Sequence, residues 1–225
     1  MRIGIGIFAK TIGHSMVKTR LAEAIGQKAA EEFYGLCVKA VEEVVTSYSN
    51  TLNVMTDELK IYWARPSGRY DISTRGLSLG VAMYKVASRI LVDCDAYIII
   101  GTDIPQMTQA TLNQTMDNLK SSPLNLVFGP SIDGGFYLLA GTYAPALKLM
   151  ENVQYSQADT LEQFLNLLHA DSIKHTLIEE LSDVDVVEDF IHLRDYLSNK
   201  SENSNDLLES QKSILQWLIK RNLSP

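Results

Sequence analysis

The sequence predicts an α/β fold organised around a largely parallel sheet, and three observations support this prediction. Strand-like apolar runs alternate with runs of helical spacing from the N-terminus to about residue 197. Residues 96–100 are continuously apolar, as expected of a strand that is buried on both faces in the middle of a sheet. Polar residues directly follow strand-like runs, at the position where open α/β sheets bind their ligands.

The elements expected before this central strand are identified by the period of their apolar residues. The longest is a helix at 29–47, in which Phe33, Cys37 and Val41 share one face. The others are a strand at 3–8, a short strand at 51–55, a short helix at 57–64, an extended piece at 70–74 and a helix at 79–91.

The elements expected after the central strand begin with a helix that Thr108 caps and that runs to Lys120. The others are strands at 124–128 and 136–140, helices at 144–150 and 157–168, an edge strand at 173–178 and a helix at 186–197. We therefore expect one domain over residues 1–197.

A linker and a tail are expected to follow this domain. Residues 198–206 contain no apolar side chain and are interpreted as a polar linker. The tail, 207–225, is expected to form an amphipathic helix at 207–222. Its apolar positions are Leu208, Leu215, Leu218 and Ile219. This helix either packs back on the domain, which we expect, or meets a partner chain, as in a homo-oligomer.

The composition excludes several classes of protein. Apolar residues make up 46% of the chain and charged residues 21%, as in ordinary globular proteins. Lys and Arg total 20 against 27 Asp and Glu, and the net charge of -7 argues against nucleic acid or anionic lipid as a partner. No stretch approaches the roughly 18 to 20 apolar residues of a membrane span. Cys37 and Cys94 cannot supply a disulfide framework, which favours a cytoplasmic location.

A basic loop follows the first strand and is the first candidate for ligand binding. Lys10, Lys18 and Arg20 concentrate positive charge there. If Lys18 and Arg20 open a short helix, each charge opposes the helix dipole by about 0.3 to 1 kcal/mol, a cost that a bound phosphate would reverse. The loop is therefore interpreted either as a phosphate-binding segment or as a solvated basic loop.

Asp103 is the second candidate, because it follows the central apolar strand. Pro105 disfavours helical backbone at Ile104, and Thr108 lies nearer the next helix, so Asp103 is poorly placed to cap that helix. A buried carboxylate without a partner would cost several kcal/mol. Mg²⁺ or Mn²⁺, with a nucleotide diphosphate completing its coordination, would satisfy Asp103.

Asp133-Gly134-Gly135, between two apolar strands, is the third candidate. Asp-Gly is a common hairpin turn, so it decides nothing by itself. The second glycine removes another side chain next to Asp133, which suits close approach of a ligand to the backbone. Asp183 and Asp185, considered alone, are explained as carboxylates at the N-terminus of the last domain helix.

Other motifs are weaker. Residues 4–9 match a dinucleotide-binding fingerprint as letters, but their glycines lie inside a strand rather than at a turn into a helix. The four histidines, His14, His169, His175 and His192, have no metal-ligand spacing. No arrangement of a serine or cysteine nucleophile with a base indicates a hydrolase.

Five of these segments, taken together, resemble one family in order and spacing. They are 8–11, 17–21, 101–105, 129–138 and 183–185. They resemble the DUF2064 group of GT-A-like glycosyltransferases in the nucleotide-diphospho-sugar transferase superfamily, and the resemblance covers about residues 3–195. It implies a three-layer α/β/α sandwich with a mixed sheet. Relatives include 2-phospholactate guanylyltransferases and molybdenum-cofactor nucleotidyltransferases, which bind a nucleotide phosphate through a divalent metal.

The resemblance also implies roles for individual residues. The basic loop, with Lys10, Lys18, Thr19 and Arg20, would bind nucleotide phosphates. Asp103 matches the metal-binding acid after the central strand, and Asp185 matches a second metal carboxylate of some superfamily members. Asp133, Gly134 and Gly135 match the acceptor side of the cleft, where a carboxylate could orient or deprotonate the attacking hydroxyl.

The chain departs from the family pattern at two charged positions. The family's Gly-Asp-Leu-Gly-x-Arg-Met segment corresponds to residues 76–83, where Ser78 and Ala82 replace the acid and the arginine. The loss of this pair could change the nucleotide or the acceptor, or leave binding without turnover.

The leading hypothesis is therefore a Mg²⁺- or Mn²⁺-dependent transferase that moves a glycosyl group from a nucleotide sugar to an unidentified small-molecule acceptor. One alternative is a nucleotidyltransferase that consumes a nucleoside triphosphate and releases pyrophosphate. The other is a catalytically degenerate nucleotide-binding protein whose tail helix contacts a partner.

Overall fold

Seven strands form one mixed sheet in the computed structural model, which describes residues 1–52, 58–204 and 207–221. The strands are β1 (Arg2–Phe8), β2 (Glu58–Arg65), β3 (Ile72–Ser73), β4 (Ala96–Gly101), β5 (Leu126–Pro130), β6 (Phe136–Gly141) and β7 (His175–Leu177). Their order across the sheet is β3-β2-β1-β4-β6-β5-β7. β6 runs antiparallel to β4 and β5, and the other recorded pairings are parallel. The predicted α/β fold with a mostly parallel mixed sheet is confirmed.

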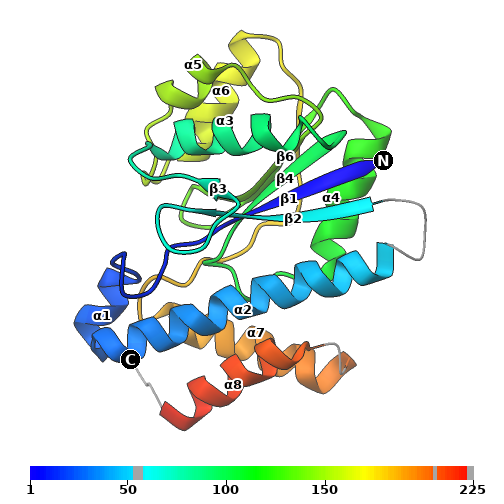
Figure 1. Cartoon of the computed structure of the whole chain (residues 1–225). Helices are drawn as coiled ribbons and strands as arrows, with labels where there is room; N and C mark the ends of the chain where they lie inside the picture. The colour runs from blue at the N-terminus through cyan, green and yellow to red at the C-terminus, as the bar shows by residue number, and fades with distance from the viewer. Residues whose placement is uncertain (53–57, 205–206, 222–225) are drawn as a thin grey trace.

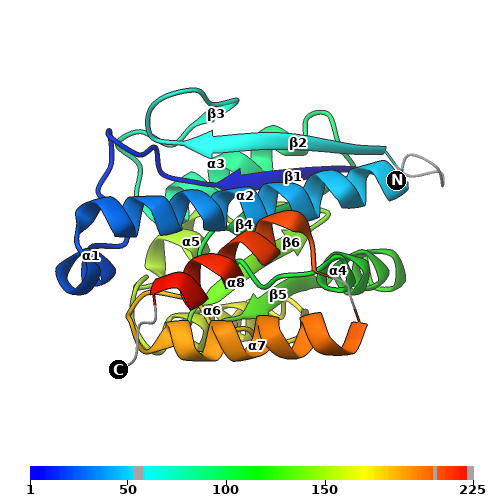
Figure 2. The same cartoon turned by 90° about the horizontal axis from the view of Figure 1, so that it is seen from below.

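Helices cover both faces of this sheet (Figure 1). They are α1 (Thr19–Ile25), α2 (Gln27–Leu52), α3 (Leu79–Ile90), α4 (Gln109–Ser121), α5 (Leu147–Asn152), α6 (Thr160–Ala170), α7 (Asp189–Ser204) and α8 (Glu209–Arg221). α3, α5 and α6 lie on one face, and α2 lies on the other with α7 and α8 beside it (Figures 1 and 2). None of the helices in the described ranges is long and apolar enough to cross a membrane.

The alternation of side chains along β1 divides the core between the two faces. Ile3, Ile5 and Ile7 are fully buried against α2 and α4. A Cβ at Gly4 or Gly6 would point the other way, towards α3. β4 follows the same rule, since Ile98 and Ile100 join the α2 side while Tyr97 and Ile99 join the α3 side. The central strands are therefore apolar on both faces, as the sequence predicted.

Most sequence-predicted elements are present with shifted ends, but the segment around residue 55 is different. α2 continues to Leu52, and residues 53–57, which include most of the short strand expected at 51–55, lie outside the described residues. The short helix expected at 57–64 is wrong, because Glu58–Arg65 forms β2 and pairs in parallel with β1. Leu59, Ile61 and Trp63 pack against the α2 side, so this segment follows a period of two.

The polar linker expected at 198–206 is also wrong over 198–204, because α7 runs to Ser204. This stretch contains no glycine or proline, and polar composition alone does not end a helix. Residues 205–206 lie outside the described residues.

The tail helix packs back on the domain as expected, and Leu208, Leu215 and Leu218 of its four predicted apolar positions contact the core. Ile214 and Leu218 are buried against α2 and α7, where they join Phe33 and Phe190. Ile219, which was expected on the apolar face, is 60% exposed. Residues 209–221 are thus part of the fold rather than a separate appendage.

Gln211 of α8 shows how closely this helix is integrated. Its side chain is 2% exposed, and its Nε2 donates hydrogen bonds to the carbonyls of Pro105 and Met107, each at 3.0 Å. These carbonyls belong to the loop that leaves β4. The helix therefore supports the segment that carries Asp103.

Replacing Ile214 by alanine should destabilise the protein by about 2 to 5 kcal/mol, because a fully buried isoleucine leaves a cavity. Ile219→Ala, on the same helix but exposed, should change the free energy of unfolding by no more than about 0.5 kcal/mol. Urea unfolding of both variants measures this difference. Equal effects would show that α8 does not pack on the domain in this orientation.

Candidate functional site

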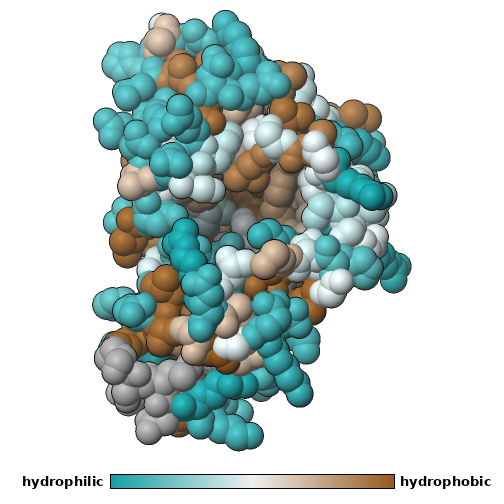
Figure 3. Space-filling model, turned by 90° about the vertical axis from the view of Figure 1, so that its left-hand side faces the viewer, coloured by the Kyte–Doolittle hydropathy of each residue, from teal (hydrophilic) through white to brown (hydrophobic). Residues whose placement is uncertain are grey.

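A cavity of about 760 Å³ opens at the edge of the sheet where β1, β2 and β4 end. β5 ends and β6 begins at the same edge, because β6 is antiparallel to its neighbours. Figure 3 shows this side of the molecule, with a hollow that is apolar at its depth and surrounded by hydrophilic residues. Open α/β sheets bind ligands at this edge.

Lys18 is the central charged residue of the site. Its ammonium contacts Asp103 Oδ1 and donates a hydrogen bond to Asp185 Oδ1 at 2.9 Å. The lysine side chain is only 2% exposed, whereas the carboxylates of Asp103 and Asp185 are 51% and 38% exposed. The two carboxylates are therefore held by a buried cation from behind and remain accessible from the cavity.

The pKa of Lys18 reflects two opposing effects. Burial acts to lower this pKa, but the negative charges of Asp103 and Asp185 outweigh burial and hold the pKa above its ordinary value. Lys18 therefore keeps its positive charge throughout the physiological pH range. Its backbone is left-handed, with φ 47°, directly before α1. This strained conformation accompanies the turn of the chain into α1.

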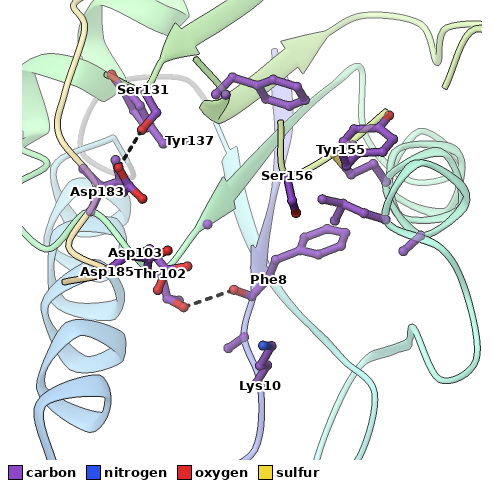
Figure 4. Close-up of a pocket in the computed structure, with 18 of the residues that line it drawn as sticks. Phe8, Lys10, Thr102, Asp103, Ser131, Tyr137, Tyr155, Ser156, Asp183 and Asp185 are labelled. Atoms are coloured by element: carbon purple, nitrogen blue, oxygen red, sulfur yellow. Dashed lines mark hydrogen bonds between the residues drawn. The ribbon is translucent and has the colours of Figure 1, made fainter. Parts of the chain in front are cut away.

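The loop that carries Asp103 is fixed by hydrogen bonds on several sides. The Thr102 hydroxyl donates to the carbonyl of Phe8 at 3.3 Å (Figure 4). The backbone N–H of Val184 donates to the Asp103 carbonyl at 3.1 Å. Thr108 is the N-cap of α4, as predicted, so Asp103 has no capping role. Its carboxylate is held at the end of β4 by tertiary contacts.

Asp183 lies on the same side of the cavity and was not singled out as a site residue from the sequence. Its Oδ1 accepts a hydrogen bond from the Ser131 hydroxyl at 3.2 Å (Figure 4). Burial, followed by the negative charges of Asp133 and Asp185, raises the pKa of Asp183 to about 6, against the opposing effect of Lys18. Several carboxylates thus share a region in which Lys18 is the buried cation.

The structure changes the explanation of Asp183 and Asp185 as helix-terminal carboxylates. α7 begins only at Asp189, whose Oδ2 accepts hydrogen bonds from the N–H groups of Asp185 and Val186 at 2.7 and 2.8 Å. Asp189 therefore stabilises the start of this helix. The side chains of Asp183 and Asp185 instead line the cavity.

Asp133 and the two glycines form the turn between β5 and β6. Asp133 Oδ1 accepts a hydrogen bond from the N–H of Gly135 at 2.9 Å, so one of its oxygens stabilises the turn. Gly134 has φ +87°, and a Cβ there would overlap the carbonyl oxygen of Ala158. The close approach of the Ala158 backbone therefore explains why position 134 is a glycine. Asp133 and Gly135, in contrast, line the cavity.

The basic residues of the first loop lie at different depths. Lys10, Thr19 and Arg20 are exposed and line the cavity, whereas Lys18 is buried between carboxylates. The short helix expected after Lys18 is present as α1. Phosphate binding by these four residues stays a prediction.

Tyr34 connects the basic loop to β4, and no signal in the sequence identified it. Its hydroxyl accepts a hydrogen bond from the N–H of Lys10 at 2.7 Å. It also lies 3.3 Å from the Thr102 hydroxyl oxygen, whose single hydrogen is shared between Tyr34 and the Phe8 carbonyl. Tyr34 also lines the cavity. This position was missed because its spacing in α2 is that of an ordinary core residue.

The donor set suits a hard divalent cation bound together with a ligand. Carboxylate oxygens are the preferred protein ligands of Mg²⁺ and Mn²⁺. The cavity lining contains Asp103, Asp133, Asp183 and Asp185 against Lys10, Lys18 and Arg20, so the acids outnumber the bases by one. No group of three His, Cys, Asp or Glu residues close enough to hold a metal occurs within the described ranges. Asp103 and Asp185 could thus supply part of a coordination shell, with ligand oxygens and water completing it.

Comparison with known proteins places the chain in a family and a fold. A family model described as "Uncharacterized protein conserved in bacteria (DUF2064)" matches residues 40–157. Asp103 and Asp133 lie inside this range, whereas Lys18 and Asp185 lie outside it. Among curated proteins, none matches the sequence.

Solved structures share the fold at low sequence identity. A "putative nucleotide-diphospho-sugar transferase" from Desulfovibrio desulfuricans G20 is 20% identical, with a TM-score of 0.76 and 97% of each chain covered. CMP:2-keto-3-deoxy-manno-octonic acid synthetase complexed with CTP is 11% identical, with a TM-score of 0.50, covering 89% of this chain and 100% of the other. These likenesses show a nucleotide-diphospho-sugar transferase-like fold, which transferase enzymes share.

A third match is the manganese complex of Rv0371c from Mycobacterium tuberculosis H37Rv. It is 10% identical, with 96% of this chain and 98% of the other covered. Its TM-score of 0.38 is too low for its manganese to support a metal site in this chain.

Asp183→Asn should change how stability depends on pH. Because the pKa of Asp183 is raised to about 6, the folded protein binds this proton more tightly than the unfolded chain, whose aspartate pKa is about 3.9. This contribution therefore favours folding at low pH and is lost as the pH rises from about 4 to about 6. As the pH rises through this window, the free energy of unfolding of the variant should increase relative to that of the native protein. Urea unfolding in the presence of a chelator measures this difference.

Asp117→Asn is the matched control, because Asp117 is exposed on α4 and does not line the cavity. Its unfolding free energy should follow that of the native protein at each pH. Parallel curves for all three proteins would contradict the electrostatic description of Asp183.

Proposed function

Because the chain belongs to the DUF2064 family and its cavity joins paired carboxylates to a basic rim, we propose that it is a metal-dependent transferase using a nucleotide-activated donor. The observation that carries this proposal is the contact of one buried ammonium, that of Lys18, with both Asp103 and Asp185. Glycosyl transfer from a nucleotide sugar is the preferred reaction.

In this proposal the donor's diphosphate lies between the basic rim and the carboxylates. Lys10, Thr19 and Arg20 contact its phosphate oxygens from the exposed side. Asp103 and Asp185 would hold Mg²⁺ or Mn²⁺, and the metal would supply positive charge beside the leaving diphosphate. Lys18 fixes the two carboxylates in place.

The acceptor lies on the side formed by the turn between β5 and β6. Asp133 has one oxygen on the Gly135 N–H and a second oxygen that can orient the attacking hydroxyl or accept its proton. Asp183, hydrogen-bonded to Ser131, lies beside it and adds negative charge. Gly135 keeps this part of the cavity open, because a Cβ there would lie 3.1 Å from Asp133 Oδ1.

Asp103→Asn should abolish metal-dependent nucleotide binding while leaving the fold intact, because Lys18 keeps its contact with Asp185. In the native protein, a nucleotide at about 100 times its dissociation constant adds about 2.7 kcal/mol, which raises the melting temperature by about 5 to 10 °C. A thermal-shift panel of nucleoside diphosphates, triphosphates and nucleotide sugars, with and without Mn²⁺, measures this shift.

Asp117→Asn should retain the full nucleotide shift. An undiminished shift in Asp103→Asn would contradict the assignment of Asp103. If no nucleotide shifts the native protein, the transferase proposal fails.

The released product distinguishes the reactions that this cavity could support. Glycosyl transfer releases a nucleoside diphosphate, whereas nucleotidyl transfer releases pyrophosphate. We expect a nucleoside diphosphate, which a coupled assay detects, and we expect Asp103→Asn to release none. Pyrophosphate would favour the nucleotidyltransferase, and tight nucleotide binding with neither product would favour a degenerate binding protein.

A further inference from the structure

The loop between α5 and α6 contains a strained residue, Ser156, that the proposed transfer chemistry does not use. Among the residues that the structure describes, those other than glycine with a positive φ are Lys18, Ser156 and Ser172. Lys18 directly precedes α1. Ser172 follows α6, and its N–H donates to the carbonyl of His169 at 3.0 Å, a common arrangement after a helix C-terminus. Ser156, with φ 62°, borders neither α5 nor α6, so no helix end explains its conformation.

The backbone on both sides of Ser156 is fixed by hydrogen bonds. The Thr160 hydroxyl oxygen lies 3.0 Å from the carbonyl oxygen of Gln154 and 2.8 Å from that of Gln157. The same oxygen accepts a hydrogen bond from the N–H of Gln157 at 3.1 Å. The N–H of Gln154 donates to Gln163 Oε1 at 3.0 Å. A strained conformation persists at one residue when its neighbours are held in this way.

The same loop packs against the turn that carries Asp133. A Cβ at Gly134 of this turn would overlap the carbonyl oxygen of Ala158, so the two backbones are in close contact. The N–H of Leu161, at the start of α6, donates to the carbonyl of Gly134 at 2.9 Å. Ser156 and Asp133 both line the cavity. The turn and the loop therefore form one continuous part of the cavity lining.

Ser156 and Gln157 offer polar groups to a ligand. Both residues are exposed and line the cavity. In Figure 4 the Ser156 hydroxyl points into the cavity. Within the described ranges, neither this hydroxyl nor the side-chain amide of Gln157 has a hydrogen-bond partner in the protein. A hydroxyl and an amide can each donate and accept hydrogen bonds, as the hydroxyls of a sugar require.

The position of these groups matches that of the transferred sugar in the proposed function. The sugar must lie between the diphosphate, beside Asp103 and Asp185, and the acceptor hydroxyl, which faces Asp133. It therefore lies next to the turn on which the Ser156 loop packs. Sugar hydroxyls that leave water without new partners lose binding free energy, so polar side chains are needed there.

We propose that the Ser156 hydroxyl binds a hydroxyl of the donor's glycosyl group, with the Gln157 amide as a second contact. This inference rests on the proposed function and names residues that recognise the sugar. Ser156 binds and takes no part in proton transfer. Its left-handed backbone is retained because a glycine, which would relieve the strain, would remove the hydroxyl that the sugar contacts.

The test compares nucleoside diphosphates with their nucleotide sugars in the presence of Mn²⁺. The pairs are UDP and UDP-glucose, GDP and GDP-mannose, and ADP and ADP-glucose, measured by isothermal titration calorimetry. The pair whose diphosphate binds the native protein most tightly is used for the variants. Ser156→Ala and Ser156→Gly should each weaken binding of the nucleotide sugar about tenfold, and binding of the diphosphate by less than about twofold.

The melting temperatures of the free proteins distinguish a binding role from a structural one. Ser156→Gly should raise the melting temperature by about 2 to 4 °C, because glycine adopts the left-handed conformation without strain. Ser156→Ala keeps the Cβ and should leave the melting temperature unchanged. A residue that served only the fold would not lose affinity for the sugar while the protein gained stability.

Ser172→Gly is the matched control, because Ser172 has φ 56°, is exposed and does not line the cavity. It should raise the melting temperature as Ser156→Gly does, and it should bind both members of the pair as the native protein does.

The outcomes separate this inference from the proposed function. Native affinity of Ser156→Ala for the nucleotide sugar, an equal loss of both ligands, or a loss confined to Ser156→Gly would overturn the inference and leave the transferase. Diphosphate binding without binding of any of these nucleotide sugars would also overturn it. If no diphosphate binds the native protein, the proposed function fails and the inference fails with it.

Discussion

The candidate site depends on one buried cation. Burying the Lys18 ammonium without partners would cost several kcal/mol of folding free energy. The carboxylates of Asp103 and Asp185 offset this cost. Lys18 and Asp185 are 167 positions apart in the chain, so their contact requires the loop after β1 and the segment before α7 to meet at the end of β4. The ion pairs of Lys18 that hold these segments together therefore also position the two carboxylates at the cavity.

Parts of the chain that look peripheral in the sequence support this arrangement. Gln211 of α8 holds the loop after β4 through two carbonyl groups, and Gln106 of that loop donates to the carbonyl of Ser182. Asp189 holds the N–H of Asp185 at the start of α7. The carboxylates of Asp103 and Asp185 are thus supported from the C-terminal part of the chain, outside the segment that the family model matches.

The sequence predicted what depends on local pattern. The apolar run of β4 placed Asp103 at a strand end, and Thr108 marked the next helix. β2 was missed because Leu59, Ile61 and Trp63 have the period of a strand over a segment too short to exclude a helix. The pairing of Lys18 with Asp103 and Asp185 could not be found this way, because no local period links residues so far apart. The resemblance grouped these three residues, but only the structure shows their contact.

The division of side chains between the core and the cavity at the end of β1 follows from one property of β strands. Successive side chains point to opposite faces, so Ile7 enters the core under α2 while Phe8 enters the cavity under α3. Gly6 lets α3 approach β1 closely, since a Cβ there would lie 2.7 Å from Val86 Cγ1. The glycines that resemble a dinucleotide fingerprint thus serve helix packing. Because α3 lies close to the sheet, Ala82 of this helix lines the cavity.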